Sequence, residues 1–319
     1  MNKPFTSYEQ QLKKLRKRGV NLPAGSSQAR RTKKLLRRAG YYSIINGYKD
    51  IFLLYPSKSG IEDIYKPNTT FDSIYSLFTF DRNMRSIFMK NILITEGVIK
   101  SHISYHFSKE YKSDFNYLNI NNFNPNKIES TTKLLTSISS IIQVDTNANQ
   151  GQIPHYLKKH KCLPLWVLMR KLNFGAVSYF YACMTSKIRK EVANEILNDY
   201  KKEYPNSNLT YPTFESELEY ILKFINRFRN VCAHEDRLFN LKYNIPRITL
   251  PYMTIISPFT SRLYDLLVLL KLFLTKQDFQ SLVKQVEEEW NNLSKYLAQN
   301  VLNEVMIKSG FPKNWKQRL

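Results

Sequence analysis

Five side chains in the stretch 226–240, which reads NRFRNVCAHEDRLFN and also contains Asn226 and Arg227, are of types that could do chemistry together. They are Arg229, Asn230, His234, Arg237 and Asn240. A histidine titrates near neutral pH and can transfer a proton, while an arginine offers a planar set of donors that matches a phosphate. Because RNA carries its own nucleophile, the ribose 2′-hydroxyl, these residue types could promote RNA cleavage without a metal ion.

The helix predicted from Thr213 onwards decides whether these side chains can meet. Its polar face carries Asn226, Asn230, His234 and Arg237. In an unbroken helix, Arg229 and His234 are about 140° apart and diverge. A working pair therefore needs the helix to end near Cys232, or a second subunit to supply the missing partner. Without either, one arginine and one histidine on a helix are more often an ordinary surface pair.

The chain of 319 residues carries 48 Lys and Arg against 26 Asp and Glu, a formal net charge of +22. Such a field concentrates polyanions at the surface, so RNA is the first partner to consider. An anionic membrane is the rival, but the most apolar run, 266–274, contains Lys271 and is too short to span a bilayer. No apolar segment follows the opening MNKP, so we predict a cytoplasmic protein without membrane contact.

Residues 1–50 hold thirteen Lys and Arg against two acidic residues. Two helices are predicted here, over 7–18 and 27–38, each followed by a glycine and the second capped by Ser26 or Ser27. Solvated helix faces would explain some of this charge, but its density favours an RNA-binding surface. The candidate residues are Lys13, Lys14, Arg16, Lys17, Arg18, Arg30, Arg31, Lys33, Lys34, Arg37 and Arg38.

Helical patterns also dominate the rest of the chain. Residues 71–109 predict one or two long helices, and 111–161 is an Asn-rich insertion with a helical island at 134–142. Pro164 begins a new helix, since proline suits a first turn. Further helices are expected at 176–184, 186–202, 264–274, 277–298 and 301–308. Because no segment alternates with period two, we predict an all-α fold.

Three other groups of residues have both a structural and a functional interpretation. The tyrosines of 40–48 could stack on unpaired bases, but their helical spacing favours the core. His102 and His106 lie one turn apart, as in some zinc sites, yet no third ligand follows at a recognisable spacing. The three cysteines are widely spaced and are predicted to be reduced core thiols. We therefore predict no metal and no cofactor.

Several short motifs occur in an order that is typical of one protein family. They are RNVCAH at 229–234 with RLFN at 237–240, GYY at 40–42 with NGY at 46–48, FDR at 80–82 with Arg85 and then Glu96, and PLW at 164–166 with FG at 174–175. The first resembles the R-polar-x-x-x-H motif of HEPN ribonucleases. Together, from about residue 10 to 275, they resemble the abortive-infection (Abi) family of bacterial phage-defence proteins. Lys100 and Glu235 depart from the family pattern, which has arginine and often histidine there.

The resemblance implies a multi-helix, HEPN-like bundle with additional N-terminal helices. The single unit 1–319 would comprise a basic N-terminal region, 1–68, and a helical core, 69–310, with a variable insertion at 111–161. Homodimerisation would bring two Arg and His motifs together across a cleft. The implied activity is a metal-independent endoribonuclease, acting in phage defence or as a toxin, that leaves a 2′,3′-cyclic phosphate and a 5′-hydroxyl.

The same resemblance implies roles for individual residues. His234 would be the general acid or base, Arg229 would hold the scissile phosphate, and Asn230 would orient one of these. The supporting residues would be Arg237, Asn240 and Glu96. An alternative class is a non-catalytic RNA-binding protein that holds a structured partner RNA with the same motif and the basic N-terminus. The two classes differ in turnover, because only the first cleaves the RNA that it binds.

Overall fold

The computed structural model describes residues 4–57, 61–148, 150–207, 209, 211, 213–243 and 259–319. Over these ranges the regular structure is helical, with only isolated β-bridges and no sheet. The predicted all-α fold is confirmed. Among the helices of these ranges, none combines the length and the apolar character that a bilayer crossing requires.

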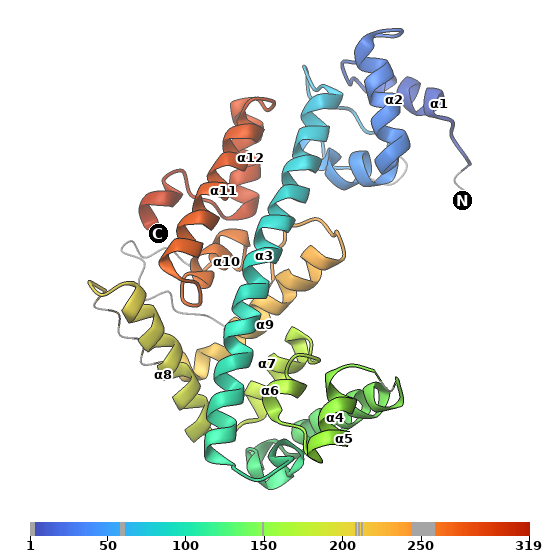
Figure 1. The fold of residues 1–319 in the computed structure, drawn as a ribbon. Coiled ribbons are helices and arrows are strands. Elements are labelled where there is room, and N and C mark those ends of the chain that lie inside the picture. Colours follow the sequence, from blue (N-terminus) through green and yellow to red (C-terminus); the bar gives the residue numbers. More distant parts are fainter. Residues whose placement is uncertain are drawn as a thin grey trace.

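One long helix, α3 (Phe71–Glu110), runs through the centre of the molecule (Figure 1). Its 40 residues make it about 60 Å long. Thr70 begins it with a capping box, in which the hydroxyls of Thr70 and Ser73 each accept from the other residue's amide. The sequence predicted either one or two helices over this stretch, and the structure has one. Buried residues occur along all of α3, because other helices cover it on several sides.

The other helices are arranged around α3 (Figure 1). Near its first turns, α1 (Tyr8–Lys17) and α2 (Ser27–Ala39) pack together, and α4 (Ile128–Ala148) and α5 (Gln152–His160) lie near its last ones. Packed along it are α8 (Ser186–Glu203), α9 (Phe214–Ala233) and α11 (Lys276–Ser294). The shorter helices are α6 (Leu165–Leu168), α7 (Phe174–Cys183), α10 (Leu263–Leu270) and α12 (Gln299–Ser309).

The two basic N-terminal helices begin at serine caps. The Ser7 hydroxyl accepts from the Gln10 amide, and the Ser26 hydroxyl accepts from the Ala29 amide. After α2, Gly40 has a φ of +81°, a conformation that favours glycine. Both helices lie where the sequence predicted them. In the stretch that follows, Tyr48 is buried and Tyr41 packs against the core, as the spacing predicted, whereas Tyr42 is 77% exposed.

The region 111–161 is more helical than the sequence indicated. The predicted island 134–142 is only the middle of α4, which has 21 residues, and α5 follows it. Leu134 and Ile138 are buried on the side of α4 that packs against α7. The predicted extent was wrong because the described flanking asparagines, a residue type common in loops, lie in or next to short helical turns or at the end of α4. Beyond this region, Pro164 opens a helix of only four residues, α6.

Candidate functional site

The helix α9 ends at Ala233, and His234 is its C-terminal cap. Glu235 follows with a φ of +57°, in the left-handed region, so the chain leaves the helix axis there. This is the helix end near Cys232 that a pairing of Arg229 with His234 requires.

A recess of about 470 Å³ lies between α9 and the start of α7. Arg229 and His234 both line it within one chain, together with Asn226 and Asn230. In a continuous helix, Arg229 and His234 would diverge. Both side chains nevertheless line this recess, which extends around the last turn of α9.

The first turn of α7 forms the facing wall of this recess. Asn173 caps the turn, since its Oδ1 accepts from the Ala176 amide at 2.9 Å. A Cβ atom on Gly175 would lie 3.3 Å from both the Asn173 Oδ1 and the Asn226 Nδ2, so glycine permits the close approach of α7 to α9. The amides and the dipole at a helix N-terminus favour an anion.

The recess presents basic groups that are available to a ligand. The Nε atom of Arg229 is buried and has no hydrogen-bond partner among the described residues. His234 is exposed and Asn230 is half-buried. Arg227 also lines the recess, and Asp236 is the one acidic side chain among the described lining residues. Because this Nε atom is shielded, a phosphate in the recess would have to meet the terminal amino groups of Arg229.

A buried carboxylate on α3 holds the segment that follows His234. Asp81 is fully buried, and its oxygens accept from the backbone amides of Leu238 at 3.0 Å and Phe239 at 2.7 Å. These bonds join residues 157 and 158 positions apart in the sequence. Leu238 and Phe239, shortly after the helix end, are therefore fixed to the central helix.

Two further side chains complete this cluster. The Tyr48 hydroxyl donates to Asp81 at 2.7 Å, and Arg85 donates to the same carboxylate at 2.6 Å. Arg85 also donates to the Asp236 carbonyl at 3.1 Å. Burial raises the pKa of Asp81, while the Leu238 amide, Tyr48 and Arg85 oppose that shift. We call Tyr48, Asp81 and Arg85 the loop clamp.

Arg237 lies away from the recess. Its guanidinium donates to the Gly47 carbonyl at 2.7 Å and to the Asp50 carboxylate at 3.0 Å. The predicted polar face shared with His234 was wrong for this residue, because the chain turns at Glu235 and no longer follows the helix. Arg237 thus joins residues 235–240, which we call the post-helix segment, to the N-terminal region.

The other predicted supporting residues are also absent from the described lining of the recess. Glu96 is buried on α3 and forms an ion pair with Lys100 at 2.6 Å, the pairing that their spacing predicted. Asn240 is half-buried at the end of the post-helix segment. A supporting role for either would have to act through packing or through a second subunit.

The histidine pair on α3 and the cysteine in the motif have structural partners. His102 lies 3.3 Å from an Asp199 oxygen and His106 lies 3.1 Å from a Glu191 oxygen, so both histidines join α3 to α8. Burial lowers the pKa of His102. Burial also raises the pKa of the Cys232 thiol to about 12, which keeps it protonated at neutral pH. Cys232 and Cys183 are buried free thiols, as predicted, whereas Cys162 is only partly buried.

The eleven predicted RNA-binding cations fall into three groups. Ion pairs to acidic residues are formed by Lys17, Arg18, Arg31 and Lys33. Backbone carbonyls accept from Arg16 and Arg30. The third group is exposed and has no acidic partner within the described ranges; it comprises Lys13, Lys14, Lys34, Arg37 and Arg38. Five of the eleven cations are thus exposed without an acidic partner in these ranges, and RNA binding by all eleven stays a prediction.

Several residues at the site received no role from their positions in the sequence. Asn173 and Gly175 line the recess, and Tyr48 and Asp81 fix the segment behind it. The FG, FDR and NGY motifs contain three of these four residues, so the motifs were the available signal. Their contacts with α9 and with the post-helix segment depend on the tertiary fold.

This geometry defines a class: an all-helical protein with an arginine and a histidine in one recess at a helix end. The chain belongs to the Abi-like protein family, which matches residues 34–240. The match includes α3, α7, α9 and the loop clamp. No curated protein and no solved structure matches the chain significantly. Membership of this family indicates a role in abortive infection, a form of phage defence.

Proposed function

We propose that this protein is a metal-independent endoribonuclease that acts in abortive infection or as a toxin. The observation that carries the proposal is that Arg229 and His234 line one recess, facing the first turn of α7. A phosphodiester there would meet a cation, a proton carrier and helix amides together. The net charge of +22 would draw RNA to the surface.

The reaction that fits this recess is transesterification at phosphorus. The ribose 2′-oxygen attacks the phosphorus and loses its proton, while the bond to the 5′-oxygen breaks and that oxygen gains a proton. Arg229 would hold the phosphate and stabilise the charge that develops on its oxygens. His234 would carry one of the two protons. Asn230 would orient the phosphate or the imidazole.

A homodimer would supply the second proton carrier. Two protons move in the reaction, and one chain places only His234 among the histidines in the recess. His234 is exposed at the end of α9, so its side chain can approach a second copy. Two recesses that face each other would combine two histidines and two arginines at one phosphate.

The test compares wild type with His234→Ala and Arg229→Ala for growth arrest and for cleavage of RNA in EDTA. The exposed His160 on α5 provides a matched control, His160→Ala. We expect the first two variants to lose toxicity and cleavage by at least about 100-fold, and the control to keep both. Equal toxicity and cleavage in all four proteins would contradict the catalytic assignment. Cleavage that EDTA abolishes would contradict the metal-free mechanism.

The alternative class predicts a different result in the same assay. A protein that only holds a partner RNA would bind it tightly and in a salt-sensitive way, without turnover. His234→Ala would then bind as well as wild type. Charge reversal at Lys34 and the neighbouring free cations would abolish that binding.

A further inference from the structure

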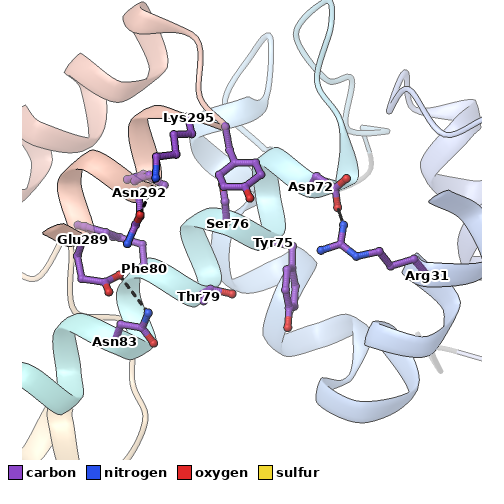
Figure 2. A pocket seen from close by; sticks show the side chains of 12 residues that line it. Arg31, Asp72, Tyr75, Ser76, Thr79, Phe80, Asn83, Glu289, Asn292 and Lys295 are labelled. Atoms are coloured by element: carbon purple, nitrogen blue, oxygen red, sulfur yellow. Dashed lines mark hydrogen bonds and ion pairs between the residues drawn. The ribbon is translucent and has the colours of Figure 1, made fainter.

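A second recess, of about 340 Å³, lies between α3 and α11, with Arg31 of α2 at its edge (Figure 2). Thr79 and Asn83 line it from α3, one turn apart. Asp81 of the loop clamp is about 200° around the helix from Thr79, so this recess lies on another face of α3. Its volume lies in the range of small-ligand sites.

The lining of this recess combines aromatic rings with both donors and acceptors. Tyr75 and Tyr296 supply the rings, and Tyr296 is 58% exposed. The Oγ1 atom of Thr79 is buried and lacks a hydrogen-bond partner among the described residues. That hydroxyl is shielded from the recess, so a ligand with a flat face and polar edges would stack on the rings and meet the other polar side chains of the lining.

Neighbouring side chains already hold the two amides of this recess in place. Asn83 donates to Glu289 at 3.0 Å, and Asn292 accepts from Lys295 at 3.0 Å, as the dashed lines in Figure 2 show. The Asn83 oxygen and the Asn292 amino group remain for a ligand. An amide acceptor and an amide donor are what the edge of a nucleobase recognises.

A row of cations lies on α2, beginning at the edge of this recess. Arg31 pairs with Asp72 at the rim of the recess (Figure 2). Lys34 and Arg38 follow at three and seven positions, which places them on the same side of the helix, over about 10 Å. Both are exposed and have no acidic partner in the described ranges. This row of cations suits the phosphates of a single strand.

We propose that the recess between α3 and α11 holds one unpaired base of an RNA strand, whose phosphates lie along α2. Within the recess, Arg31 and Lys295 are balanced by Asp72 and Glu289, so the lining is close to neutral and suits a base better than a phosphate. The unbalanced charge lies outside, on α2. This proposal rests on RNA as the ligand of the proposed function, but it does not require cleavage.

The experiment measures binding of fluorescent single-stranded RNA oligonucleotides to the full-length His234→Ala protein, so that cleavage cannot interfere. Tyr296→Ala and Asn292→Ala should each weaken binding by at least about five-fold, because a stacked or edge-bound base contributes that much. Asn291→Ala, at the exposed adjacent position on α11, is the matched control and should bind normally. Ultraviolet cross-linking of a 4-thiouridine oligonucleotide should label the peptide that contains Tyr296.

Charge reversal tests the path of the phosphates. Lys34→Glu should weaken oligonucleotide binding and reduce its salt dependence, whereas Lys159→Glu on α5, with the same change in net charge, should not. Unchanged binding in the recess variants would overturn the proposal. If a mononucleotide bound as tightly as an oligonucleotide, the ligand of the recess would be a free nucleotide, and the proposal of an RNA strand would be overturned. A wild type that binds in this way but never cleaves RNA would contradict the proposed function alone.

Discussion

At the scale of single residues, the two central side chains of the site differ in how far they are buried. Arg229 is partly buried with its Nε atom shielded, whereas His234 is exposed at the end of α9. A bound phosphate would therefore find the arginine already placed, and the histidine would be ordered by the substrate or by a second subunit. Lys could not replace Arg229, because a point charge lacks the fork of donors.

Gly175 tests how closely α7 must approach the recess. In Gly175→Ala, the new methyl group crowds Asn173 and Asn226 at 3.3 Å, so the recess should narrow or shift and RNA cleavage should fall by about ten-fold or more. The unfolding free energy should change by less than about 1 kcal/mol, since alanine favours the helix. Gly97→Ala, where the structure leaves space, is the control and should retain activity. Full activity in Gly175→Ala would contradict this role of the close approach.

At the scale of elements, the site is a helix end whose exit path is fixed elsewhere. The segment after α9 would be free to move if its only attachment were the helix itself. Asp81 binds two of its amides and Arg85 binds one of its carbonyls, so α3 determines its direction. Asp81 of the FDR motif thus fixes the segment that follows His234, although Asp81 is not among the described residues that line the recess.

The loop clamp should be important for stability and for activity. Asp81→Ala leaves Arg85 buried without its carboxylate, so the unfolding free energy should fall by about 3 kcal/mol. In protein that remains folded, amide exchange at Leu238 and Phe239 should accelerate and cleavage should drop. The exposed ion-pair partner Glu129, replaced by alanine, should leave both quantities nearly unchanged. Slow exchange at 238 and 239 in Asp81→Ala would contradict the clamp.

The sequence predicted local features of these elements well and tertiary ones poorly. The serine caps and the long apolar pattern of α3 are local signals, and those helices lie where they were expected. Arg237 was placed on the wrong face because the left-handed turn at Glu235 has no strong local signature. The bonds from Asp81 to residues 157 and 158 positions away arise only from the tertiary fold.

At the scale of the whole molecule, the site depends on how separate parts of the chain meet around α3. The N-terminal region contributes Tyr48 to the loop clamp, and α7 and α9 form the recess. The basic helices lie near one end of α3 (Figure 1). An RNA strand that contacted both α2 and the recess between α7 and α9 would bridge surfaces about two hundred residues apart in the sequence.

Mixing wild type with His234→Ala protein tests whether two subunits share one site. If both histidines of a homodimer are needed, an equal mixture after subunit exchange should retain about one quarter of the activity of pure wild type. Independent sites in each chain would retain about one half. Light scattering on the same samples gives the mass, and a monomeric mass together with the half value would contradict the shared site.

The most direct test of the central claim is the chemistry of the RNA ends that purified protein produces in EDTA. Wild type should leave a 2′,3′-cyclic phosphate and a 5′-hydroxyl, because the 2′-oxygen is the nucleophile and the recess of Arg229 and His234 only moves protons and stabilises charge. His234→Ala should produce no such ends above background. A 5′-phosphate, or the same cyclic ends from His234→Ala at the wild-type rate, would contradict the account.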